Sequence, residues 1–125
     1  MVSSRIAKVF LELAREPGHP FGDSKYAYHI YLPLTDDGRI DADSWMQNPA
    51  RCRVRRFRPG EEAMNGRLRR GPGSRWFFDY DDRTDFDDEA GFRYDSERFV
   101  PGEYVSIRED DGSLHTFQVI DVRPQ

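Results

Sequence analysis

Short segments in which apolar and polar residues alternate recur along this chain, and this period of two is the feature that most constrains its fold. The clearest segment is 26–34, where Tyr28, Ile30 and Leu32 share one face and His29 and Tyr31 the other. Such alternation predicts a half-buried β-strand. Weaker segments of the same kind predict further strands at about 51–57, 67–70, 75–80, 103–109 and 113–122.

Two turn signals predict how some of these strands pair. Asp111-Gly112 separates the last two segments and predicts a two-residue hairpin turn. The resulting register places His115 opposite Arg108, as a cross-strand pair on the surface. Asn65-Gly66 predicts a second hairpin turn, at the rim of the sheet because its flanks are polar.

The N-terminal segment, about 4–15, has a different spacing. Ile6, Val9, Phe10 and Leu13 stand at i, i+3, i+4 and i+7, which predicts an amphipathic helix packed on the sheet. A second, short helix is expected through Trp45, capped by Asp41 or Asp43. We therefore expect one domain over 1–125 of mainly β (α+β) class. Its architecture is a small antiparallel sheet, curled into a partly open barrel, with the N-terminal helix packed on it.

Aromatic residues supply much of the material for a core. Phe, Tyr and Trp make up 14% of the 125 residues, and each buried ring removes about 150–250 Å² from water. We expect these rings to fill the interior. The alternative is a pocket for a small planar ligand. Its ring lining would be Tyr26, Tyr28, Tyr31, Trp76, Phe78 and Tyr80.

Several classes of protein are disfavoured. Cys52 is the only cysteine, so an intramolecular disulfide and a cysteine-based zinc site are excluded. The three histidines have no metal-ligand spacing, and no nucleotide-binding or nucleophile motif occurs. The sequence therefore predicts no catalytic residue, metal or cofactor. Charges interrupt the N-terminal apolar residues and no long apolar run follows, so we expect a cytoplasmic protein without a membrane partner.

Cys52 itself has two interpretations. The neighbouring arginines can lower the pKa of its thiol and make it nucleophilic. The alternative is a small buried apolar residue.

Charge is strongly segregated along the chain. The segment from Arg51 to Arg75 contains nine arginines and two glutamates, which gives a local net charge of +7. The segment from Asp79 to Glu97 contains nine acidic residues and two arginines, which gives a local net charge of −7. One interpretation is that the acidic segment, a predicted loop at 81–97, folds back and neutralises the basic strands. The other is that both remain available to partners.

The functional hypotheses follow from these charges. The first is a non-enzymatic binding module for a protein partner or a second copy of itself, using the two charged surfaces. The second is a barrel that binds single-stranded nucleic acid through arginines and a stacking ring, Phe57 or Trp76. The third is an enzyme or binder acting on a small anionic ligand. The candidate binding residues are Arg53, Arg55, Arg67, Arg69 and Trp76; the candidate acidic docking loop carries Asp81, Asp82, Asp85, Asp87, Asp88 and Glu89.

Overall fold

The computed structural model describes residues 5–71, 75–81, 97–109 and 112–125, together with the backbone of 89–93. Eight strands, one short α-helix and one 3₁₀ turn lie within these residues. In chain order they are β1 (Ile6–Leu13), β2 (Asp23–Pro33), α1 (Ala42–Gln47), η1 (Pro49–Arg51), β3 (Arg53–Phe57), β4 (Met64–Gly71), β5 (Arg75–Tyr80), β6 (Glu89–Arg93), β7 (Tyr104–Arg108) and β8 (Leu114–Pro124).

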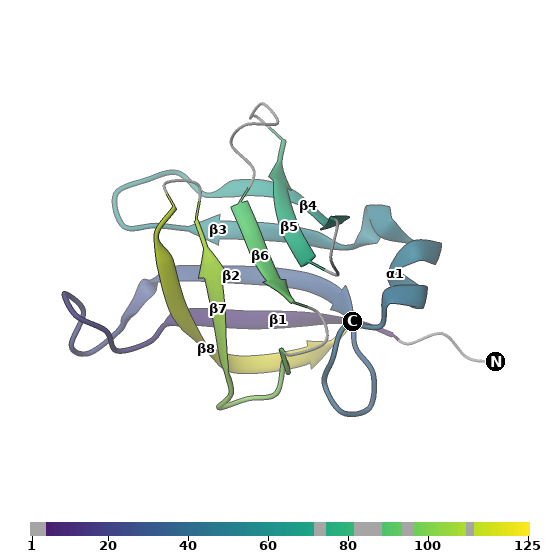
Figure 1. Cartoon of the computed structure of the whole chain (residues 1–125), viewed down its shortest axis with the longest axis horizontal. Coiled ribbons are helices and arrows are strands. Elements are labelled where there is room, and N and C mark those ends of the chain that lie inside the picture. Colours follow the sequence, from purple (N-terminus) through teal and green to yellow (C-terminus); the bar gives the residue numbers. More distant parts are fainter. Residues whose placement is uncertain (1–4, 72–74, 82–88, 94–96, 110–111) are drawn as a thin grey trace.

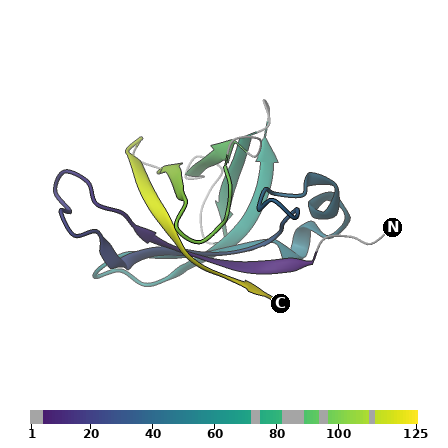
Figure 2. The ribbon, with the colours of Figure 1, turned by 90° about the horizontal axis from the view of Figure 1, so that it is seen from below.

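The strands form one antiparallel sheet in the order β6-β5-β4-β3-β2-β1-β8-β7. The sheet curls strongly, so its two end strands, β6 and β7, come to lie next to each other (Figure 1). Viewed from below, it has the shape of a half-barrel (Figure 2). The prediction of a mainly β, antiparallel, curled sheet is confirmed. Among the described residues no helix is long and apolar enough to cross a bilayer.

The predicted N-terminal helix is wrong. Residues Ile6–Leu13 form β1, which pairs with β2 on one side and with β8 on the other. Val9, Leu11 and Leu13 are buried, whereas Lys8 and Phe10 point to the opposite face. The segment therefore also has a period of two. Two neighbouring strands satisfy its backbone groups, and this tertiary pairing outweighs the weak helical spacing.

The two turn predictions need correction as well. Asn65 and Gly66 lie inside β4, opposite Arg55 and Val54 of β3, and the connection between these strands is 58–63. In the last hairpin Ile107, rather than Arg108, lies opposite His115. This shift by one residue moves His115 from the surface to the inner face of the sheet.

The other predicted elements are close to those observed. β5 spans the predicted residues 75–80, and β2, β3, β4, β7 and β8 each overlap their predicted ranges. Asp41 caps α1 by accepting a hydrogen bond from the Ser44 amide at 3.1 Å. The predicted loop at 81–97 is interrupted by β6, whereas 82–88 and 94–96 lie outside the described residues.

The core lies on the concave side of the half-barrel and is rich in rings. Trp76, Phe78 and Tyr80 of β5 are almost fully buried, as are Tyr28 and Phe117. Tyr28 packs edge-on against Phe117, with 5.0 Å between ring centroids. These rings fill the interior, as the composition suggested. Because Trp76 has no exposed surface, it is not part of any surface on which a base could stack.

Candidate functional site

The predicted arginines lie together on the outer, convex face of the sheet. Arg53 of β3 lies opposite Arg67 of β4, and Arg55 and Arg69 occupy the next outward positions on these strands. Val54 and Leu68 alternate with them and face the core. Of the four arginines, only Arg53 and Arg67 lie directly opposite each other, because the antiparallel register places Arg55 opposite Asn65.

Two of these arginines are paired with acids of the same chain. Arg53 Nη2 lies 2.8 Å from Asp81 Oδ2, and Arg69 Nε lies 2.6 Å from Asp79 Oδ2. Both acids belong to the negatively charged segment, so its described part neutralises two of the four candidate arginines. Asp82, Asp85, Asp87 and Asp88 lie outside the described residues, and only the backbone of Glu89 is described.

The third arginine of β3, Arg56, has a different environment. The alternation of β3 continues through Arg56, which turns inward and is 3% exposed. Its guanidinium lies over the Tyr80 ring, 5.0 Å from the centroid, and 2.9 Å from Met64 Sδ. Arg56 belongs to the core and is not a surface cation.

A row of rings crosses the outer face beside the arginines. The rings of Phe10 (β1), His29 (β2) and Phe57 (β3) follow one another across three strands. The centroid of His29 lies 4.6 Å from that of Phe10 and 4.7 Å from that of Phe57. All three rings are partly exposed. Their contacts with one another hold them in place, so the row offers ring surface with little freedom left to lose.

Cations flank this row. Arg55 lies over the Phe57 ring at 5.2 Å, and Lys8 lies over Phe10 at 5.0 Å and over Tyr31 at 5.4 Å. Among the described residues, neither Arg55, Lys8 nor Arg67 makes an ion pair with an acid. We call this surface the outer platform; it comprises Lys8, Phe10, His29, Tyr31, Arg55, Phe57 and Arg67.

His29 reports on the electrostatics of the outer platform. Burial, together with the positive charges of Lys8 and Arg55, lowers the pKa of His29 below its ordinary 6.5. His29 is therefore neutral at pH 7. In the unfolded chain its pKa returns toward 6.5, so the unfolded state binds more protons as the pH falls through this window.

We therefore expect the free energy of unfolding to fall below pH 6.5 until the folded pKa of His29 is passed. Replacing Lys8 or Arg55 by Ala is expected to raise the pKa of His29, because each removes a repelling charge. An NMR titration of the His29 ring measures its pKa in each variant, and urea unfolding at a series of pH values measures the free energy of unfolding. An equal replacement at Arg108, on β7, is the control. A pKa of His29 at or above 6.5 in the unmodified protein would contradict this account.

A second cluster of polar residues lies at the end of the half-barrel where the β1–β2, β3–β4 and β7–β8 connections meet. Its centre is the buried Glu109 carboxylate. The hydroxyls of Tyr26 and Tyr28 donate to it, the latter at 2.6 Å, and Arg58 Nη2 lies 3.1 Å away. Burial and the hydrogen bond to Glu109 raise the pKa of Tyr26 above its ordinary range. The buried Glu109 carboxylate therefore has two hydrogen-bond donors and an ion-pair partner.

His115 extends this cluster outward. Its Nε2 lies 3.5 Å from Glu109, and its Nδ1 lies 2.7 Å from Glu16, a residue of the β1–β2 connection. The chain Glu16–His115–Glu109 is the group that sequence reasoning missed, because the shifted register had placed His115 on the surface. A carboxylate–imidazole chain can relay a proton, but a reaction also needs a cavity for substrate. Neither described cavity is lined by any of these three residues.

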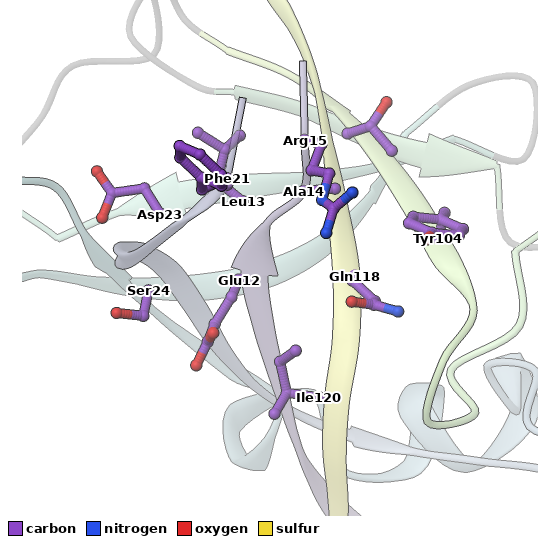
Figure 3. Close-up of a pocket in the computed structure, with 12 residues that line it drawn as sticks. Glu12, Leu13, Ala14, Arg15, Phe21, Asp23, Ser24, Tyr104, Gln118 and Ile120 are labelled. Atoms are coloured by element: carbon purple, nitrogen blue, oxygen red, sulfur yellow. The ribbon is translucent and has the colours of Figure 1, made fainter. Parts of the chain in front are cut away.

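Two cavities among the described residues are large enough to consider as binding sites. The larger, of about 990 Å³, lies between the β1–β2 connection and the outer face of β8. In Figure 3, Phe21 and Asp23 border one side, and Tyr104, Gln118 and Ile120 the other. Phe21, Tyr104 and Ile120 are among the most exposed large apolar residues described. The smaller, of about 350 Å³, lies between β4 and the α1–η1 segment.

The sequence left open whether Cys52 is a reactive thiol or a small buried apolar residue. Cys52 has no exposed surface, and burial raises the pKa of its thiol to about 11. It is a core residue and not an activated nucleophile. Within the ranges that the structure describes, no three His, Cys, Asp or Glu side chains are grouped to hold a metal ion.

Comparison with known proteins adds no further constraint. No family model matches the chain, and neither a curated protein nor a solved structure matches it significantly.

Proposed function

We propose that this protein binds single-stranded nucleic acid on the outer platform. The observation that carries the proposal is the row Phe10–His29–Phe57, flanked by Lys8 and Arg55, which form no ion pair with a described acid. Arg123 also lies over Phe10, at 5.0 Å, and is paired with Asp121. Aromatic side chains on a β surface stack on bases of any sequence, and neighbouring Lys and Arg bind the phosphates. The proposal needs no catalytic group.

The spacing of the platform suits such a ligand. Adjacent strands lie about 4.8 Å apart, so the row from β1 to β3 extends over roughly 10 Å. That distance is enough for two bases, each stacked on a ring of the row. Arg67 on β4 lies opposite Arg53, four residues along β3 from Phe57. It would provide a phosphate contact to one side of the row.

A titration with labelled oligo(dT) at low salt, followed by fluorescence anisotropy, tests the proposal. Replacing Phe57 by Ala is expected to weaken binding about 5- to 150-fold, since one base–ring contact contributes about 1–3 kcal/mol. Binding should also fall with salt, with a logarithmic slope of about −2 for three phosphates at about −0.7 each.

Leu114 provides the matched control, because it is an exposed apolar side chain on β8, away from the platform. Leu114→Ala should bind as the unmodified protein does. Absence of binding at tens of micromolar, or an equal loss in both variants, would overturn the proposal.

A second candidate function is supported by the larger cavity. Its rim exposes Phe21, Tyr104 and Ile120, which is the kind of apolar surface that protein interfaces cover. The occupant would be a protein partner, and a second copy of the chain is the simplest one. Light scattering at low and high ionic strength distinguishes self-association through the apolar rim from self-association through the charged segments. A dimer that persists at high salt favours apolar contact, dissociation by salt favours the charged segments, and a monomer in both removes self-association.

A further inference from the structure

We infer that the smaller cavity, between β4 and the α1–η1 segment, is a binding site for a single nucleotide, with its base against the aromatic side chains of the wall and its phosphate on arginine. This inference deepens the proposed function, on which it rests, because Arg67 of the outer platform also lines the cavity. Its volume of about 350 Å³ is small, at the lower end of ligand pockets, and suits a ligand of this size.

Two aromatic side chains border the cavity from separate elements. Phe77 belongs to β5 and points outward, and Trp45 belongs to α1. Trp45 is held in place, because its indole N–H donates to the Leu68 carbonyl at 2.9 Å and its ring packs edge-on against Trp76 at 5.2 Å. A fixed ring loses little conformational entropy when a base stacks on it.

Three arginines of β4 supply positive charge at the same cavity. Arg67, Arg69 and Arg70 all line it, and all three are exposed. Asp79 partly neutralises Arg69, whereas Arg67 has no described acid as partner. The remaining wall is apolar and includes Pro49 and Ala50. Rings, an apolar wall and an unneutralised guanidinium together select a planar ligand that carries an anion.

Calorimetric titration of the full chain with AMP tests the inference, with adenosine and inorganic phosphate as separate arms. AMP should bind, and each of the other two should bind at least tenfold more weakly, because each makes only part of the contacts. Ala50→Phe places a ring into the cavity from an exposed position and should abolish AMP binding. Phe77→Leu retains an apolar side chain and should weaken it about 5- to 150-fold.

The outcomes separate this inference from the proposed function. If oligo(dT) binds but AMP does not, the cavity is no nucleotide site and the platform proposal stands. If Ala50→Phe binds AMP as tightly as the unmodified protein, the inference is also overturned. Loss of AMP binding in Ala50→Phe with an unchanged unfolding midpoint supports it. Inorganic phosphate binding as tightly as AMP would contradict a role for the two rings.

Discussion

Replacing Glu109 by Ala is expected to lower the free energy of unfolding by about 3–5 kcal/mol, the cost of breaking a buried ion pair from one side. The carboxylate accepts from Tyr26 and Tyr28 and lies 3.1 Å from Arg58. Without it, the Arg58 guanidinium and the two tyrosine hydroxyls lose the buried acceptor that they share. Glu109→Gln should cost less, because its amide oxygen still accepts one of these bonds.

The measurement is the urea midpoint, with Glu103→Ala as the matched control. Glu103 is half-exposed, and its one described ion pair, with Arg98, is 4.0 Å long. A surface pair of this kind contributes about 0–1 kcal/mol. If Glu109→Ala and Glu103→Ala shift the midpoint equally, the Glu109 cluster does not stabilise the barrel end as described.

Gly66→Ala is the second substitution with a large expected effect. A Cβ at Gly66 would lie 2.5 Å from the Asp79 carbonyl oxygen and 2.9 Å from Tyr80 Cα. Both are backbone atoms of the neighbouring strand β5, so no side chain can turn away to make room. We expect a loss of about 1–3 kcal/mol, as for other overpacked sites.

Asn65→Ala is the control, because Asn65 is the exposed neighbour of Gly66 on the same strand. Its expected change is within about 0.5 kcal/mol. Thermal unfolding of both variants, followed by near-ultraviolet circular dichroism, gives the comparison. A Gly66→Ala variant that unfolds with the unmodified midpoint would show that β4 and β5 are not in such close contact.

Local sequence patterns predicted most strands and the pairing of β7 with β8, but not the other strand partners. The segment 75–80 could be placed to the residue, because alternating rings and polar residues permit only one assignment. Ile6–Leu13 could not, because Val9 and Leu13 fit both a helical stripe and one face of a strand. Only the pairing of this segment with β2 and β8 resolves the ambiguity, and that pairing is not a local property.

The candidate site shows the same division. The outward arginines follow from alternation alone, so Arg53, Arg55, Arg67 and Arg69 were predictable. The row of rings was not, because Phe10, His29 and Phe57 come from three segments whose registers are fixed only in the folded sheet. Likewise, Asp79 and Asp81 could be assigned to Arg69 and Arg53 only once β4 and β5 were known to be neighbours.

The measurement that most directly tests the platform is an NMR titration of the isotope-labelled protein with unlabelled oligo(dT). If bases stack on the row of rings, the largest shift changes should fall on the ring signals of Phe10, His29 and Phe57, with smaller ones at Lys8 and Arg55. Saturating oligonucleotide that leaves these signals in place, or moves only signals of β7 and β8, would contradict a binding surface on this side of the sheet.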